Sequence, residues 1–163
     1  RSILTRRKAA GMLLSRQNLR TVDRTTHGAA TGVDKGAYIL KEAAAAPRVV
    51  IIATGSEVSI ALDVQIALEK DGLSTRVVSA PCLEWFDEQT SEYRESVLPA
   101  SVKARVSVEA GLSLGWSKYV GGFGESVSIE HFGASADYAT LFREFGMTVE
   151  NVVAAAKTSL SKI

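Results

Sequence analysis

The stretch RVVIIATGSEVSIALDV, residues 48–64, decides the fold of this chain. Residues 49–52 (VVII) form an unbroken β-branched run, which is typical of a strand that is buried on both faces. The sequence TGS at 54–56 then predicts a tight turn, because glycine permits a sharp change of direction and a hydroxyl can cap a helix. Apolar side chains recur after the turn at helical spacing, at Val58, Ala61, Leu62 and Ile66. The stretch therefore predicts a strand, a turn and a helix.

The chain after residue 37 continues this alternation. We expect further strands at 37–41, 74–80, 104–109 and 125–130, and helices at 86–98, 112–120, 135–145 and 149–161. Such alternation implies βαβ crossovers and helices on both faces of a sheet. The expected fold class is α/β, a Rossmann-like three-layer domain with a mixed, mostly parallel sheet of about five strands. The most buried strand residues should be those at 49–52, 77–78 and 106–108.

The first 36 residues differ from the rest. Residues 2–10 are expected to be the tail of a helix, and residues 12–14 (MLL) a short buried strand. Residues 20–36 are polar and glycine-rich, so we expect them to form a linker at a domain boundary. Residues 1–24 hold seven of the 19 basic residues and one of the 18 acidic residues, so they carry +6 and the rest −5. A basic segment can bind phosphate or nucleic acid, or it can be a solvated helix end and linker. No aromatic residue lies among these charges, which argues against a platform for single-stranded nucleic acid.

Composition narrows the class of protein. The 163 residues are 46% hydrophobic and 23% charged, as in ordinary globular domains. No apolar run approaches the ~20 residues that span a bilayer, so we expect no membrane partner. Cys82 is the single cysteine, which fits a reducing compartment and a cytoplasmic location. The first residue is Arg1 rather than Met, so we expect a piece of a longer protein.

Few residues have the spacing of a catalytic or metal site. Glu109 and the pair Glu130 and His131 end two strands, and a Glu–His pair could act in acid–base chemistry. Adjacent side chains of a strand point to opposite faces, so Glu130 and His131 are not expected to cooperate, and hydrogen bonding at the sheet edge is the expected role of these residues. One cysteine and two histidines provide no metal-ligand spacing. The turn at 54–56 is a generic anion site at a helix N-terminus, but Glu57 would repel a phosphate there.

Arg16 is the strongest candidate for a binding residue. It follows the apolar residues 12–14 directly, within the polar sequence SRQN at 15–18. A guanidinium in such a place can bind a phosphate through two parallel hydrogen bonds. The alternative is an ion pair that closes two domains on each other. From the residues alone, the chain is an α/β domain with a candidate phosphate-binding arginine.

Seven stretches resemble the C-terminal part of transketolase, a thiamine diphosphate-dependent enzyme of the pentose phosphate pathway. They are LLSRQNL (13–19), KGAYIL (35–40), IIATGSEVSIAL (51–62), TRVVSAPCLEWFDEQ (75–89), YRESVLP (93–99), ARVSVEAG (104–111) and HFGASADYATLFREFGMTVENVV (131–153). They occur in the family's order with similar gaps and cover nearly all of the chain from residue 11. Related thiamine enzymes, such as 2-oxo-acid dehydrogenase β subunits and deoxyxylulose phosphate synthase, share the fold but are not expected to share SRQNL or EHFGASA.

The resemblance implies a division of the chain and one site residue. Residues 1–19 would be the tail of the preceding, pyrimidine-binding domain, 20–36 a linker, and 37–163 the transketolase C-terminal domain. In that family the arginine of SRQNL contacts the phosphate of the sugar substrate, which assigns substrate binding to Arg16. The family's cofactor and metal motif and its activating glutamate belong to the preceding domains. No catalytic, cofactor-binding or metal-binding residue is therefore assigned within this chain.

The resemblance also implies the function. The complete enzyme would transfer a two-carbon ketol unit between sugar phosphates, using thiamine diphosphate and Mg²⁺ or Ca²⁺, and would form a homodimer. The fragment itself is expected to hold no cofactor and to be inactive without the missing N-terminal domains. No nucleic acid is expected as a partner. The alternative is a regulatory or assembly module that binds an anion or a partner at the strand-end cleft near Gly55 and Ser56.

Overall fold

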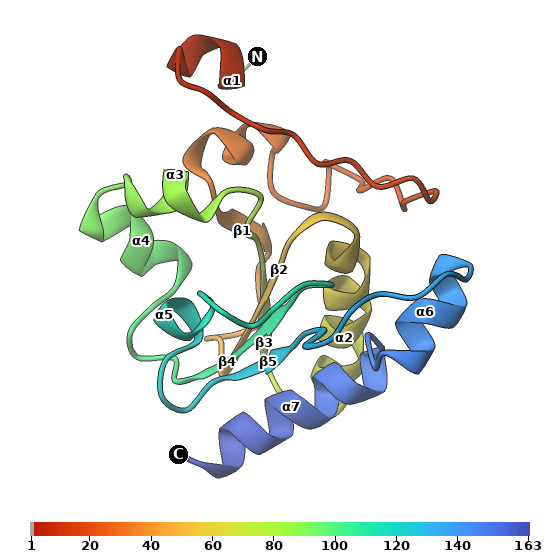
Figure 1. Cartoon of the computed structure of the whole chain (residues 1–163). Helices are drawn as coiled ribbons and strands as arrows, with labels where there is room; N and C mark the ends of the chain where they lie inside the picture. The colour runs from red at the N-terminus through yellow and green to blue at the C-terminus, as the bar shows by residue number, and fades with distance from the viewer. Residues whose placement is uncertain (1) are drawn as a thin grey trace.

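One five-stranded sheet lies between two layers of helices in the computed structural model, which describes residues 2–163 (Figure 1). The strand order is β1-β3-β2-β4-β5. β1 runs antiparallel to β3, whereas the other neighbouring pairs are parallel. This arrangement confirms the expected α/β class and the mixed, mostly parallel sheet of five strands.

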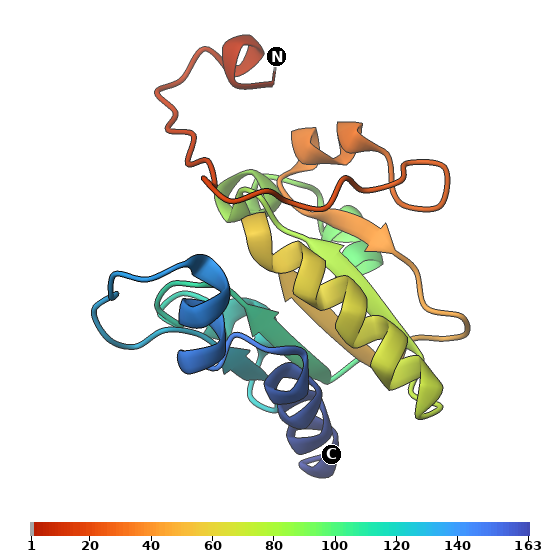
Figure 2. The ribbon, with the colours of Figure 1, turned by 90° about the vertical axis from the view of Figure 1, so that its right-hand side faces the viewer.

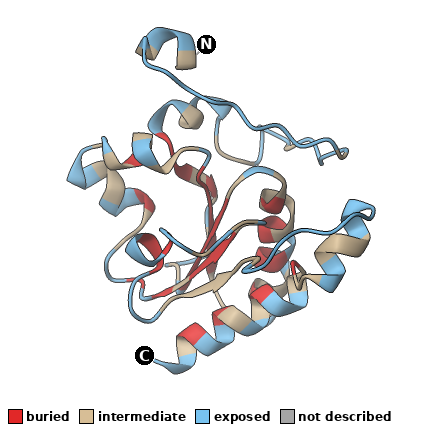
Figure 3. Ribbon diagram, in the orientation of Figure 1, coloured by how far each residue is buried: buried red, intermediate tan, exposed pale blue. Residues whose placement is uncertain are grey.

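The three central strands form the floor of the core. They are β2 (Val49–Ala53), β3 (Thr75–Ser79) and β4 (Ala104–Val108), and every residue of β2 and β3 is buried (Figure 3). Ile51 of β2 is in register with Val77 on one side and with Val106 on the other. The β-branched run at 49–52 forms this strand because burial of each such side chain stabilises the fold by about 1.5–3 kcal/mol. The predicted most buried strands are confirmed.

The two edge strands are short. β1 spans Tyr38–Lys41 and β5 spans Glu125–Val127. The sequence predicted that the last strand would reach residue 130, but the chain leaves the ladder after Val127. The Ile129 N–H donates to the carbonyl of Gly111, and the Glu130 carboxylate accepts a hydrogen bond from the Ser113 N–H, so both groups bind the loop after β4.

Helices cover both faces of the sheet. α2 (Val58–Lys70) and α7 (Val149–Ser161) lie side by side on one face, where Leu68, Val152 and the odd-numbered residues of β2 share one apolar cluster (Figure 2). The opposite face carries α3 (Leu83–Asp87), α4 (Ser91–Val97) and α5 (Ser117–Val120). The shorter elements are α1 (Ser2–Arg6), η1 (Ala30–Lys35), η2 (Gly55–Glu57) and α6 (Tyr138–Glu144).

Some helix boundaries follow the sequence closely and others do not. Thr148 caps α7 as predicted, because its hydroxyl accepts a hydrogen bond from the Asn151 N–H. The single helix expected at 86–98 is two helices, since Thr90 caps a new one and accepts from the Tyr93 N–H. The helix expected at 112–120 is confined to Ser117–Val120.

The turn after β2 differs from its predicted form. Gly55 has a φ of 55°, a conformation that favours glycine, and it begins the short η2 turn. Neither Thr54 nor Ser56 caps α2 with its side chain. The buried face of α2 consists of Ala61, Leu62, Val64, Gln65 and Leu68, so the prediction that Ile66 belongs to it is wrong.

The N-terminal segment contains the largest departure from the sequence predictions. Residues 12–14 were expected to form a buried strand, but they form no strand and Leu13 is 96% exposed. An apolar strand is buried only when a neighbouring strand pairs with it, and none does so within residues 2–163. The following segment, by contrast, packs on the domain: the Gly28 N–H donates to the Leu40 carbonyl at 2.7 Å, and Val22 and Val33 contact the core.

Candidate functional site

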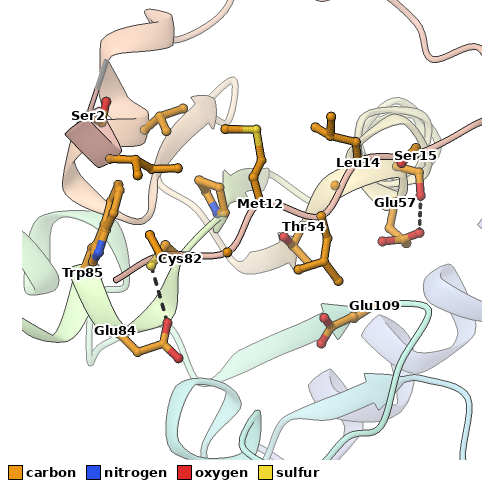
Figure 4. A pocket seen from close by; sticks show the side chains of 18 of the residues that line it. Ser2, Met12, Leu14, Ser15, Thr54, Glu57, Cys82, Glu84, Trp85 and Glu109 are labelled. Carbon is orange, nitrogen blue, oxygen red and sulfur yellow. Dashed lines mark hydrogen bonds between the residues drawn. The ribbon is translucent and has the colours of Figure 1, made fainter. Parts of the chain in front are cut away.

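A cavity of about 1000 Å³ lies at the carboxyl ends of β2, β3 and β4, and we call it the strand-end pocket (Figure 4). Its domain side is lined by Thr54, Gly55, Ser56, Glu57, Pro81, Cys82, Glu84, Trp85, Glu109 and Ala110. Its other wall is the N-terminal segment, from Ala9 to Ser15 together with Ser2 and Ile3. Ligands of open α/β sheets bind at this end of the strands, so the pocket lies where the fold predicts a site.

The lining of the strand-end pocket is acidic. Glu57, Glu84 and Glu109 all line it, whereas none of the lining residues within the described range 2–163 is Lys, Arg or His. Glu57 is only 4% exposed, and its carboxylate accepts a hydrogen bond from the Ser56 hydroxyl at 2.6 Å. Burial raises the pKa of Glu57, and the nearby Glu109 carboxylate raises this pKa further. This charge disfavours an anion beside Gly55 and Ser56, and with it the anion-binding alternative.

Other groups in the strand-end pocket are bound to neighbours rather than poised for chemistry. The Trp116 indole N–H donates to Glu109 Oε2 at 2.5 Å. The Cys82 thiol donates to Glu84 Oε2 at 3.4 Å, and partial burial raises the pKa of this thiol. A raised thiol pKa keeps the group protonated at neutral pH, and a protonated thiol is a poor nucleophile.

The sequence analysis did not expect Glu130 and His131 to act together, and in the structure the two side chains have different partners. Glu130 accepts hydrogen bonds from the Ser113 N–H at 2.8 Å and from the Ser128 hydroxyl at 2.7 Å. The His131 ring instead lies edge-on to Phe145, with ring centroids 4.6 Å apart. Across residues 2–163, no group of three or more His, Cys, Asp or Glu side chains is placed to hold a metal ion.

Arg16 is next to the strand-end pocket in the chain but is not among the residues that line it. It is exposed and directly follows Ser15, which lines the pocket. Its guanidinium makes no hydrogen bond or ion pair with any residue of the described range 2–163. No acidic residue in this range therefore forms the domain-closing ion pair that was the alternative role of Arg16. Arg16 is free to bind a ligand, and the structure does not bring it together with Glu109, Glu130 or His131.

Sequence reasoning considered Glu57 and Glu109 separately, but it missed that these two residues and Glu84 line one pocket. Glu57, Glu84 and Glu109 follow the ends of β2, β3 and β4 by four, five and one residues. Parallel strands end at the same edge of a sheet, so acids placed this soon after successive strands could have been predicted to converge. The described part of the chain also contains no helix long and apolar enough to cross a membrane.

Comparison with known proteins gives one consistent family. The family profile described as "Transketolase-like TK C-terminal domain" matches residues 36–148. The transketolase of Mycobacterium tuberculosis (strain H37Rv) is 49% identical over 98% of this chain, and the chloroplastic transketolase of Zea mays is 45% identical over 96% of it. These matches cover 24% and 23% of the two relatives, so the chain spans about a quarter of their length.

Solved structures agree with the sequence comparisons. The transketolase of Leishmania mexicana superposes with a TM-score of 0.74 and 45% identity over 80% of this chain and 19% of that protein. The Pichia stipitis transketolase in complex with sedoheptulose-7-phosphate superposes with a TM-score of 0.80 and 36% identity, over 90% of this chain and 21% of that protein. The sheet, its helical layers and the matched residues together show that this chain belongs to the transketolase family and contains the family's C-terminal domain.

Proposed function

We propose that this chain is the C-terminal part of a transketolase, an enzyme that transfers a two-carbon ketol unit between sugar phosphates in the pentose phosphate pathway. The observation that carries the proposal is the 49% identity with a transketolase over 98% of the chain. The match covers 98% of the chain and so extends beyond the sheet into the N-terminal segment, which a shared fold alone does not require. A homodimer and a cytoplasmic location are part of the proposal.

The proposed division of the chain keeps 1–19 as the tail of a preceding pyrimidine-binding domain, 20–36 as a linker and 37–163 as the C-terminal domain. Two observations support it. The sheet and both helical layers are complete without residues 1–19. The exposed apolar residues 12–14 have the character of a strand that pairs with a sheet outside this domain.

Arg16 is the proposed substrate-binding residue, and its ligand is the phosphate of the sugar. Its guanidinium is exposed and unpaired within residues 2–163, and its place in SRQNL corresponds to the phosphate-binding arginine of the family. A guanidinium holds a phosphate through charge-assisted hydrogen bonds, each worth about 1.5–3 kcal/mol. The relative from Pichia stipitis was crystallised with a sugar phosphate, which is the ligand class that this assignment requires.

Thiamine diphosphate and Mg²⁺ or Ca²⁺ would bind to the longer enzyme, where the cofactor carries the carbon–carbon bond chemistry. The strand-end pocket does not fit this cofactor, because its three glutamates would repel a diphosphate and its lining residues within 2–163 include no cation. The proposal therefore gives no residue of this chain a role in a catalytic step. Its proposed contribution is to bind and orient the substrate phosphate and to support the preceding domains.

A chimera tests this function directly. The C-terminal quarter of the Mycobacterium tuberculosis transketolase would be replaced by residues 1–163 of this chain, and ketol transfer would be measured with added thiamine diphosphate and Mg²⁺. We expect turnover within about tenfold of the parent enzyme, since the catalytic domains are unchanged. A folded, cofactor-loaded chimera without turnover would refute the proposed function. The same chimera carrying Arg16→Ala serves as the internal control for the phosphate contact.

A further inference from the structure

One arginine holds the start of the N-terminal segment on the C-terminal domain. The Arg6 guanidinium donates from Nη1 to Glu88 Oε2 at 2.6 Å and from Nη2 to the Asp34 carbonyl at 3.1 Å. Its Cζ atom lies 4.1 Å from the centroid of the Trp85 ring, which is cation–π distance. Three different partners, on η1, on α3 and just after α3, therefore converge on a single side chain.

The neighbouring basic residues are held much less firmly. The Arg6 side chain is 25% exposed, whereas the Lys8 side chain is 74% exposed and reaches Glu88 only at 3.4 Å. Arg7 lies between them, and its side chain has no hydrogen bond or ion pair within residues 2–163. The hydrogen bonds from Arg6 and Lys8 lower the pKa of Glu88, so Glu88 is ionised at neutral pH. Arg6 is thus the most firmly held of these three basic residues, and Arg7 is its matched control.

The segment that carries Arg16 lies between this contact and a weaker one. At its far end Arg20 pairs with Asp63 of α2 at 3.1 Å, with both side chains about half exposed. Exposed pairs of this kind contribute little, whereas the start of the segment is held by the three contacts of Arg6 and by a hydrogen bond from the Ser2 hydroxyl to the Asp34 carboxylate. Between the two ends, the residues from Ala9 to Ser15 form one wall of the strand-end pocket (Figure 4), and Arg16 is the next residue of the chain.

We propose that Trp85, Glu88 and the backbone carbonyl of Asp34 form an interdomain docking site for Arg6, and that Arg6 is a positioning residue which holds the Arg16 segment over the strand-end pocket. The partner of this surface is the basic segment that precedes the C-terminal domain in the same chain. A planar guanidinium suits the site because it can stack on an indole and bind a carboxylate and a carbonyl at once. The positioning of Arg16 for substrate binding rests on the proposed function, whereas the docking site for Arg6 does not.

The docking site can be tested on the 163-residue chain by NMR. The chain has two tryptophans, so its spectrum shows two indole N–H signals, and only Trp85 touches Arg6. Arg6→Ala should shift the Trp85 signal and lower the heteronuclear NOE of residues 2–15 to values typical of a flexible tail. Arg7→Ala should change neither. Glu88→Gln tests the same contact from the domain side, and Arg6→Lys should restore only part of the order.

Unchanged NOE values for residues 2–15 in both Arg6→Ala and Glu88→Gln would overturn the docking site. The positioning role needs kinetics of the longer enzyme or of the chimera. There Arg6→Ala should raise KM for sugar phosphates by about 3- to 10-fold with kcat unchanged, and Arg7→Ala should leave both constants as they are. A released segment with an unchanged KM would overturn the positioning role. Failure of the unsubstituted chimera to transfer ketol units would instead refute the proposed function. It would leave the docking site untouched, because the NMR experiment tests that site on the 163-residue chain.

Discussion

Arg76 and Glu42 form a two-point ion pair between β3 and the connection after β1. Arg76 Nε and Nη2 donate to the two Glu42 carboxylate oxygens at 2.8 and 2.9 Å. The remaining nitrogen, Nη1, donates to the carbonyls of Ser96 and Val97, where α4 ends. Arg76 is only 8% exposed, so one buried guanidinium ties an edge connection and a helix end to the central sheet.

Replacement of this guanidinium should destabilise the fold. Arg76→Met keeps an apolar stem but leaves the Ser96 and Val97 carbonyls without their donor, which costs about 1–3 kcal/mol for each buried group that stays unpaired. We expect a loss of roughly 2–4 kcal/mol in the free energy of unfolding, measured by urea titration. The matched control is Arg48→Met, because Arg48 is exposed and has no ion pair within residues 2–163, and it should cost less than about 0.5 kcal/mol. Equal losses in the two variants would contradict the role of Arg76.

Replacement of the buried Glu57, in contrast to that of Arg76, should stabilise the fold, and this gain should depend on pH. Burial raises the pKa of Glu57 in the folded state above its ordinary value of 4.5, so ionisation at neutral pH opposes folding. Glu57→Gln should therefore raise the free energy of unfolding at pH 7. The gain should fade as the pH falls below the folded-state pKa and vanish below about 4.5, where the carboxyl is protonated in both states.

Thermal unfolding of the two proteins between pH 3.5 and 8 measures this difference. Glu84→Gln provides a control, since Glu84 lines the same pocket but is exposed, and its replacement should change stability little at any pH. A Glu57→Gln variant that is less stable than the parent at pH 7 would show that the ionised carboxylate makes a favourable contact that outweighs its burial.

Local signals in the sequence were sufficient for most of the fold. The run at 49–52 predicted β2 because four β-branched residues in succession suit only a fully buried strand, and Thr148 predicted the start of α7 because a cap acts within one turn. The failures involve distant neighbours. Residues 12–14 have the pattern of a buried strand, but burial needs a pairing strand that residues 2–163 do not supply. Ile66 has helical spacing, but α7 packs on a different face of α2.

The candidate site was less predictable than the fold. Arg16 could be proposed from the sequence because its motif is local, whereas the contact that attaches its segment to the domain joins Arg6 and Trp85, which are 79 positions apart. The convergence of Glu57, Glu84 and Glu109 depends on strand order, which places β2 between β3 and β4. Sequence spacing along one segment does not reveal either relationship.

The 163-residue chain alone should not transfer ketol units. The described residues that line its strand-end pocket include no cation for a diphosphate, and the proposed function assigns the thiamine cofactor to domains that precede it. A coupled assay with a ketose phosphate, an aldose phosphate, thiamine diphosphate and Mg²⁺ measures this, with the Mycobacterium tuberculosis relative as the positive control. Turnover by the isolated chain above a no-protein blank would refute this assignment.

Arg16→Ala should weaken binding of phosphorylated sugars in the longer enzyme or in the chimera. Loss of a charge-assisted phosphate contact of ~1.5–3 kcal/mol corresponds to roughly a 10- to 100-fold rise in KM at ~1.4 kcal/mol per decade. The effect should fall chiefly on KM, because the contact is present in the ground state as well as in the transition state. Unphosphorylated sugars should be affected far less.

Two comparisons separate this assignment from a structural role of Arg16. Arg16→Lys should recover only part of the binding, because an ammonium lacks the planar fork that matches two phosphate oxygens. The melting temperature should not change, since the Arg16 guanidinium has no partner within residues 2–163. Arg7→Ala removes an equally exposed positive charge from the same segment and should leave KM unchanged, so it controls for a general loss of positive field. An equal rise in KM for phosphorylated and unphosphorylated sugars, together with a lower melting temperature, would show that Arg16 closes two domains instead of binding the phosphate.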